Sequence, residues 1–294
     1  MYNILLAVGG VVLIIIGTSL MGESSSKFSG SATVIDKLSP VACMGLSTII
    51  TAIVQSSSGV TTAAALLAGS GAVSLGQAFA IVIGANIGTT STAWLYAVAD
   101  LQSSITVAIS VAIGIAGLIM FAAGNEKVAT AGKILIGLDV FINGAAQISN
   151  ISSTFSLPEL IQSNPLALIV SGTATTAVIQ SSSAGIGVLQ ALSSSGEIPL
   201  QSAAYIVVGM NIGTCATALI ATFFSKRTAK TVAYFHLIFN TVTGLAFCAI
   251  INIFHLNFAA NPTNIAMVHT GCNLTGALIF APIMVIKMFR RKLG

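Results

Sequence analysis

The chain has 294 residues, of which 55% are hydrophobic and only 6% are charged. A soluble domain carries about 25% charged residues, so the composition excludes a soluble globular enzyme and predicts an all-α polytopic membrane protein. The formal net charge of +4 does not indicate a nucleic-acid partner, because the distribution of the basic residues has another explanation.

The first apolar segment, residues 4–21, approaches the ~20 residues that a helix needs to cross a bilayer. No basic residue precedes it and no convincing cleavage site follows it, so we expect a retained helix and not a signal peptide. Two segments, 40–69 and 166–195, are predicted to be re-entrant hairpins that enter and leave on one face. The other predicted full crossings are 75–99, 102–123, 128–149, 199–224, 231–254 and 264–286.

This threading follows from the basic residues, because lysine and arginine mark the cytoplasmic side of a membrane. Seven crossings and two hairpins place every basic cluster on that side, whereas full crossings in place of both hairpins would put Lys127 and Lys133 outside. The clusters are Lys27 with Lys37, Lys127 with Lys133, Lys226 with Arg227 and Lys230, and Lys287 with Arg290, Arg291 and Lys292. We therefore expect a protein of the cell inner membrane with a cytoplasmic C-terminus.

The two predicted hairpins carry the same sequence. Thr51–Ser58 (TAIVQSSS) matches Thr176–Ser183 (TAVIQSSS), and further on GANIGT at 84–89 matches GMNIGT at 209–214. Both matches have an offset of 125 positions, and 20 of 43 aligned residues between 51–93 and 176–218 are identical. Shared apolar composition cannot produce such agreement, so we infer an internal duplication.

Three crossings separate the two copies, and an odd number turns the second copy upside down in the membrane. We therefore predict a single transmembrane transport domain, residues 1–294, with inverted repeats at 40–123 and 166–254. Inverted repeats with discontinuous helices are typical of transporters that bind their substrate near the midplane. Such a pair can open its site to the two sides in turn.

Each hairpin is interrupted at its polar QSSS tip, and an unwound backbone survives in a membrane only where protein or a wet cavity surrounds it. We expect GxNIGT to break the next helix in the same way. Such tips offer helix N-termini to an oxyanion, and hydroxyl, amide and carbonyl oxygens to a hard cation such as Na⁺. With no basic side chain nearby, an anion would depend on a co-bound cation. Isolated serines and threonines are better explained by helix packing.

These residues resemble the type II sodium-dependent phosphate cotransporter family, including its bacterial members, over about residues 40–280. The resemblance implies sodium-coupled uptake of inorganic phosphate, with both QSSS hairpins forming the substrate and ion sites. It makes Na⁺ the co-transported ion, held through Gln55, Ser56, Gln180 and Ser181, although the division of serines between anion and sodium stays open. The implied site residues are Gln55, Ser56, Ser57, Ser58, Gln180, Ser181, Ser182 and Ser183, with Asn86, Thr89, Asn211 and Thr214 as neighbours.

Two departures from the family accompany this resemblance. Gly59 follows the first motif where relatives more often have alanine, and a glycine would loosen the tip. Many bacterial relatives continue into a soluble regulatory domain, whereas this sequence ends in a basic tail. Regulation of that kind is therefore expected to be absent or supplied in trans by a partner protein, and the oligomeric state stays open.

Asp139 lies in the middle of 128–149, and ionisable groups inside membranes are functional by default. We assign it either to an ion pathway or to a structural contact with a neighbouring group. His236 with Asn240 and His269 with Asn273 share helix faces, for which we favour interhelical hydrogen bonds over catalysis. The four cysteines are scattered and are read as core residues, without a metal site or disulfide framework.

The sequence thus predicts a secondary active symporter of sodium and phosphate, and not an enzyme. A symporter of another small oxyanion or polar solute is the nearest alternative. An ion channel would need a continuous wet path in place of two opposed gates. An intramembrane serine hydrolase would need a base beside a QSSS serine, and no GxSxG motif is present.

Overall fold

The computed structural model describes residues 2–23, 35, 37–99, 103–123, 125–154, 164–195, 197–256 and 258–292. Within these ranges the chain is helical and contains no named strand. The elements are α1 (Tyr2–Glu23), α3 (Pro40–Val54), α4 (Ser57–Ser70), α5 (Leu75–Val98), α6 (Ser104–Ala122), α7 (Glu126–Ser149), η1 (Ser152–Thr154), α9 (Pro165–Ile179), α10 (Ser182–Leu192), η2 (Ser193–Ser195), α11 (Leu200–Gly213), α12 (Cys215–Thr222), α13 (Arg227–Phe254) and α14 (Pro262–Lys292).

The seven predicted crossings are confirmed as helices that are long and apolar enough to span a membrane, by length and composition, among the described residues. The span over Leu200–Thr222 combines α11 and α12. By contrast, α3 and α9 have 15 residues each, about 22 Å of helix, and fall short of the ~30 Å hydrocarbon core. The protein is therefore a multi-pass membrane protein with two short helix pairs.

Both short helix pairs begin with the same arrangement, a capping side chain followed by a proline. Pro40 opens α3 behind Ser39, whose side chain accepts a hydrogen bond from the Ala42 amide at 3.2 Å. Pro165 opens α9 behind Asn164, which accepts from the amides of the first turn. A capping side chain followed by proline satisfies or removes the first free N–H groups of a helix. Local sequence therefore determines where each helix pair starts, without help from tertiary contacts.

The prediction that GxNIGT breaks a helix is wrong for the first repeat, because α5 runs unbroken through residues 84–89. In the second repeat only Thr214 interrupts the helix, and it keeps right-handed helical torsion angles. The glycines serve close packing instead. A Cβ at Gly84 would collide with the Met44 carbonyl on α3, and a Cβ at Gly209 would collide with the Ile169 carbonyl on α9.

This close packing is repeated between the two halves of the chain. Thr48 donates to the Gly84 carbonyl at 3.1 Å, and Thr173 donates to the Gly209 carbonyl at 3.1 Å. The α3–α5 and α9–α11 pairs are therefore built alike, down to equivalent hydrogen bonds between helices. Small residues at such crossings are typical of membrane helix interfaces.

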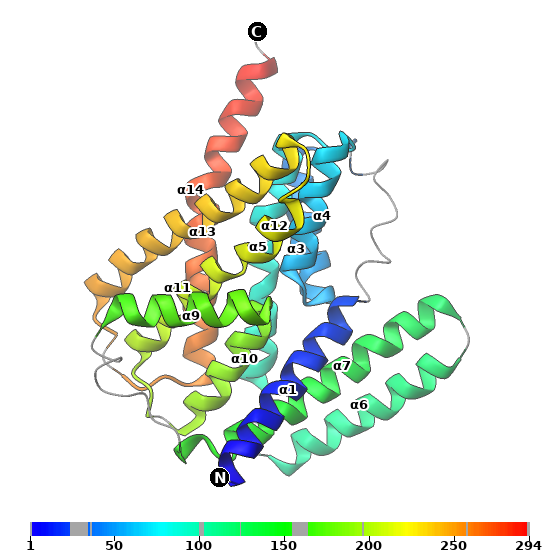
Figure 1. The fold of residues 1–294 in the computed structure, drawn as a ribbon, viewed down its shortest axis with the longest axis vertical. Coiled ribbons are helices and arrows are strands. Elements are labelled where there is room, and N and C mark those ends of the chain that lie inside the picture. The colour runs from blue at the N-terminus through cyan, green and yellow to red at the C-terminus, as the bar shows by residue number, and fades with distance from the viewer. Residues whose placement is uncertain are drawn as a thin grey trace.

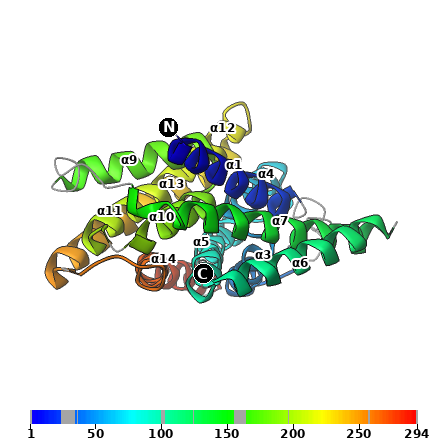
Figure 2. The ribbon, with the colours of Figure 1, turned by 90° about the horizontal axis from the view of Figure 1, so that it is seen from below.

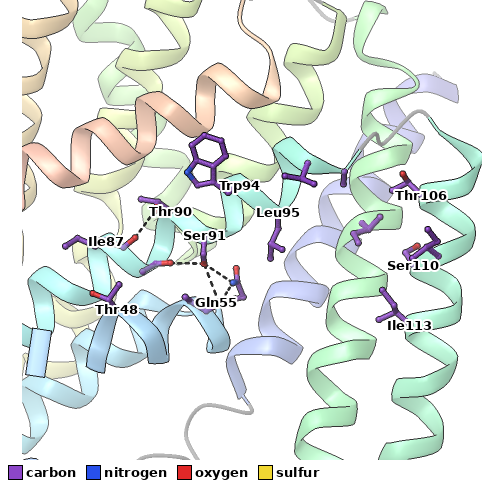
Figure 3. A pocket seen from close by; sticks show the side chains of 16 residues that line it. Thr48, Gln55, Ile87, Thr90, Ser91, Trp94, Leu95, Thr106, Ser110 and Ile113 are labelled. Atoms are coloured by element: carbon purple, nitrogen blue, oxygen red, sulfur yellow. Dashed lines mark hydrogen bonds between the residues drawn. The ribbon is translucent and has the colours of Figure 1, made fainter. Parts of the chain in front are cut away.

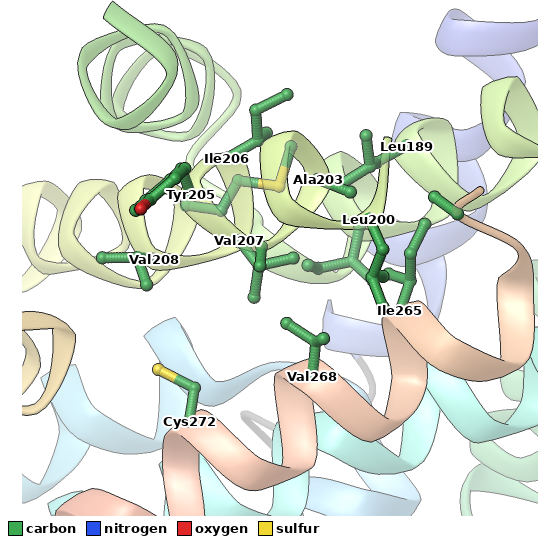
Figure 4. Close-up of a cluster of buried hydrophobic side chains, with 14 of the residues drawn as sticks. Leu189, Leu200, Ala203, Tyr205, Ile206, Val207, Val208, Ile265, Val268 and Cys272 are labelled. Carbon is green, nitrogen blue, oxygen red and sulfur yellow. The ribbon is translucent and has the colours of Figure 1, made fainter. Parts of the chain in front are cut away.

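The core gathers around α11 and α14 (Figures 1 and 4). Val207 and Val208 of α11 pack with Val268 and Cys272 of α14 in one buried cluster, which Leu189 of α10 joins. In contrast, α6 packs along α7, and α7 packs along α1. These three helices lie at the lower right of Figure 1, and in Figure 2 α6 and α7 extend together toward the right edge of the molecule.

The basic clusters are only partly covered by the described residues. Lys27 lies outside them, as do the side chains of Lys287, Arg290, Arg291 and Lys292. The basic turn before α13 and the N-terminal part of α7 are described. The inverted orientation of the repeats and their sidedness stay predictions.

Candidate transport site

Each QSSS motif begins where a helix ends in a left-handed residue. Gln55 terminates α3 with φ 59° and ψ 24°, and Gln180 terminates α9 with φ 59° and ψ 21°. Positive φ is uncommon for residues other than glycine, and among the described non-glycine residues only His255 shares it. The chain therefore leaves both helices with the same sharp change of direction, and such backbone outliers often accompany functional sites.

The next residue in each motif starts a new helix. Ser56 accepts a hydrogen bond from the Gly59 amide at 3.3 Å, and Ser181 accepts one from the Ala184 amide at 3.2 Å. These caps place the partially positive N-termini of α4 and α10 at the two tips, beside the carbonyl ends of α3 and α9. Each tip therefore offers groups for an anion and for a cation.

The two tips meet at one cavity of about 400 Å³. The Ser58 hydroxyl donates to the Gln180 carbonyl at 3.2 Å, which joins the repeats directly. The cavity is lined by Thr18, Ser19, Gln55, Ser56, Ser57, Ser58, Val178, Ile179, Gln180, Ser181, Ser182 and Ser183. All eight QSSS residues that the sequence singled out are thus brought together, although they lie 125 positions apart in the chain.

Two serines of the QSSS motifs have hydroxyls with no hydrogen bond to any described residue: Ser57 and Ser182. Their neighbours are already engaged, since Ser56 and Ser181 cap helices, and Ser58 bonds across the repeats. Ser57 and Ser182 are 5% and 4% exposed. Because both line the cavity, we assign their small exposed surface to it. Among the QSSS serines, their hydroxyls are therefore the ones free to donate to a bound solute.

The charge of the cavity is also informative. Of the described residues that line it, none is acidic or basic. An ion inside would be held by hydroxyls, amides, helix termini and any co-bound ion of opposite sign. This is the neutral polar cage that the sequence predicts.

Helix α1 contributes Thr18 and Ser19 to the cavity, and sequence reasoning missed both. Thr18 already donates to the Ile14 carbonyl at 3.0 Å. The only sequence signal was a pair of small polar residues near the end of an apolar helix. That signal was weak, because α1 lies outside the duplicated segments.

The residues of the GxNIGT motifs do not line this cavity. Asn86 donates to the Val82 carbonyl and Thr89 to the Ala85 carbonyl, both within α5. Thr214 likewise donates to the Met210 carbonyl, whereas Asn211 points to the Cys272 sulfur on α14, at 3.6 Å. These four side chains stabilise helices and their packing behind the tips.

Asp139 lies between α6 and α7, away from the tip cavity. Its Oδ1 accepts from the Asn143 side chain at 2.7 Å, and the same amide donates to Ser110 at 3.1 Å. Its carboxylate lies so close to Gly114 that a Cβ there would collide with Oδ2. The structural contact considered for Asp139 is therefore present, and its role on an ion pathway stays a prediction.

A second cavity, of about 760 Å³, lies between the α3–α5 pair and the α6–α7 pair (Figure 3). Its lining is mostly apolar and includes Thr48, Trp94 and Ser110. Gln55 lines both cavities, and its amide Nε2 donates to Ser91 at 3.1 Å. Gln55 therefore separates the polar tip cavity from the apolar one.

The histidines do not support serine chemistry at the tips. His236 and His269 are each 1% exposed, and neither lines the tip cavity. Asn240 donates to the Cys215 sulfur at 3.2 Å, and Asn273 donates to the His269 carbonyl at 2.9 Å. The first of these is an interhelical bond, and the second lies within α14.

Known proteins resemble this chain over most of its length. The family model described as Na+/Pi-cotransporter matches residues 13–150 and again 153–276. An uncharacterised protein of Bacillus subtilis (strain 168), YqeW, is 31% identical over 215 residues, which cover 70% of this chain and 67% of that protein. No solved structure matches. With a matched family model over both halves and two polar tips that share one cavity, the chain belongs to the Na+/Pi-cotransporter family.

Proposed function

We propose that this protein is a secondary active symporter that couples Na⁺ entry to the uptake of inorganic phosphate by alternating access. The observation that carries the proposal is the uncharged polar cavity where the two QSSS tips meet. Phosphate would bring a charge of about −1 to −2, and among the described residues no basic side chain lines the cavity to balance it. A co-bound sodium ion would supply that balance, so the anion and the cation would bind together.

The tips suggest how the two ions divide the site. The free hydroxyls of Ser57 and Ser182 lie in the first turns of α4 and α10, where helix N-termini favour an anion. The carbonyl ends of α3 and α9, with Gln55 and Gln180, favour a cation. We therefore place phosphate toward the second and third serines of each motif, and Na⁺ toward Gln55, Ser56, Gln180 and Ser181.

The membrane arrangement belongs to the same proposal. The helix pairs α3–α4 and α9–α10 would re-enter from opposite faces, as parts of inverted repeats 40–123 and 166–254 within one transport domain. The basic C-terminus would face the cytoplasm across the inner membrane. The shared cavity supports this arrangement, because two hairpins that re-enter from opposite faces would bring their tips together near the middle of the membrane.

Uptake of ³²P-phosphate into proteoliposomes tests this proposal. We expect saturable uptake that requires an inward Na⁺ gradient and falls to background when choline replaces Na⁺. Equal uptake in choline would overturn sodium coupling. Sulfate that competes fully at equal concentration would favour the alternative of a less selective oxyanion symporter.

A further inference from the structure

The glutamines of the two tips share a backbone conformation but not a side-chain environment. Gln55 is 5% exposed. Its Nε2 donates to Ser91 at 3.1 Å and to the Ala52 carbonyl, and its Oε1 accepts from the Thr92 hydroxyl. The Gln180 side chain is exposed and forms no hydrogen bond with any described residue. The Gln55 side chain is therefore hydrogen-bonded to α5, whereas the Gln180 side chain is bonded to no described residue.

Gln180 has no bound threonine, but the second repeat contains a threonine equivalent to Thr92. Thr217 occupies the position equivalent to Thr92 at the offset of 125. Its hydroxyl is buried and has no partner among the described residues. A buried hydroxyl without a partner carries a desolvation cost. The second repeat thus contains an equivalent glutamine and threonine, Gln180 and Thr217, that are not hydrogen-bonded to each other.

The two repeats begin to differ at the position of Thr214. As far as Gly88 and Gly213 the two repeats pack alike, since a Cβ at either glycine would meet the equivalent threonine, Thr51 or Thr176. Beyond that point α5 continues as one helix and carries Thr92 to Gln55. In the second repeat Thr214 interrupts the helix, and beyond it α12 packs against α4 and α13. There the Thr217 hydroxyl forms no hydrogen bond with Gln180.

Resting on the proposed transport function, we propose that Thr92 and Thr217 are positioning residues of a latch that the two repeats exchange. In this conformation Gln55 is bound to Thr92, and in the opposite-facing conformation Gln180 is bound to Thr217 while Gln55 is released. The exchange requires α12 to adopt the packing that the C-terminal half of α5 has here, while the C-terminal half of α5 adopts the packing that α12 has here.

In this proposal the hydrogen bonds between the two repeats also change to their equivalents in the opposite-facing conformation. The Thr92 hydroxyl also lies 3.2 Å from the Ser183 hydroxyl, so it connects the first latch to the second tip. In the opposite-facing conformation Thr217 takes Ser58 as its neighbour, and Ser183 donates to the Gln55 carbonyl. The two conformations then make equivalent bonds, which keeps their free energies close enough for both to be populated.

Labelling of a single reporter cysteine tests the latch without any transported solute. Ser19→Cys places a thiol at the cavity lining, and a membrane-impermeant maleimide is applied to either face of oriented vesicles. Thr92→Val removes the latch of this conformation, and Thr217→Val removes the latch of the other. We expect the ratio of labelling from the two faces to shift about two- to tenfold in opposite directions, the effect of one lost hydrogen bond.

Three controls make the result decisive. The parent chain without Ser19→Cys gives the background from the native cysteines. Thr92→Ser and Thr217→Ser keep the hydroxyl and should keep the parental ratio. The double variant Thr92→Val with Thr217→Val should return the ratio close to the parental value. Shifts in the same direction, or no shift in either single variant that still folds, would overturn the latch even if sodium-coupled uptake is intact.

Discussion

The two repeats agree at their helix breaks and differ in the helix that follows. Ser56 has φ −137° and ψ 87°, and Ser181 has φ −142° and ψ 107°, while the preceding glutamines agree within 3° in ψ. Yet α5 is continuous, whereas its counterpart is divided at Thr214 into α11 and α12. The same motif therefore fixes the break, and the surroundings decide how the next helix meets it.

The difference concerns the neighbours of each helix. On one side α5 packs against α3, and on the other it packs extensively against α14. In the second repeat α12 leaves α9 and packs against α4 and α13. Duplicated sequences thus adopt unequal packing within one chain. A pair of elements with two packing arrangements is what a switching transition requires.

The largest expected effect comes from filling the helix crossings that the repeats share. Gly84→Ala and Gly209→Ala should each destabilise the fold by about 1–3 kcal/mol, because the new Cβ collides with backbone and cannot be relieved by rotating a side chain. The check is the midpoint of thermal unfolding in detergent. Gly45→Ala on α3 is the control, since its Cβ would meet nothing within 4 Å, and an equal loss of stability there would contradict this prediction.

The next effect concerns transport through the tips. Ser57→Ala and Ser182→Ala should each lower the initial rate of Na⁺-driven phosphate uptake about tenfold, as one lost hydrogen bond to a charged ligand would. Unfolding temperatures should stay close to the parent, because these hydroxyls bond to no described residue. Ser70→Ala, at the exposed end of α4, is the control. Parental uptake in both tip variants would rule out our placement of the anion.

A smaller effect separates the two glutamines. Gln55→Ala should cost about 1–2 kcal/mol more in unfolding free energy than Gln180→Ala, because only Gln55 loses buried hydrogen bonds to α5. Chemical denaturation of the ligand-free protein in detergent measures both. Equal costs would mean that the asymmetry between the repeats does not persist in solution.

The smallest effect is expected at Asp139. Asp139→Asn preserves the size of the side chain and one acceptor for Asn143, and Asp139 does not line the tip cavity. We expect the Na⁺ concentration for half-maximal uptake to change less than about threefold, which is less than in cavity variants. A larger shift would place Asp139 on the ion pathway, and Gly114→Ala, which presses on its carboxylate, should then produce a shift as well.

Much of the site was predictable from the sequence because its cause is local. QSSS follows a 15-residue apolar helix in both repeats, and the glutamine, the serine cap and the preceding proline start are all short-range features. The role of GxNIGT was misjudged for a related reason. Glycine and asparagine suggest a break in isolation, but inside α5 the glycines let α3 approach closely, and Asn86 bonds back to its own helix.

The sequence by itself determined the membrane-spanning class, the seven long helices, the duplicated motif and the position of both helix breaks, because hydrophobicity, capping and repetition act over a few residues. Only the tertiary structure decided that α1 joins the cavity, that Thr92 fastens Gln55, and that Thr217 stays apart from Gln180. These outcomes depend on which helices pack against which, and duplicated segments can pack differently when their neighbours differ.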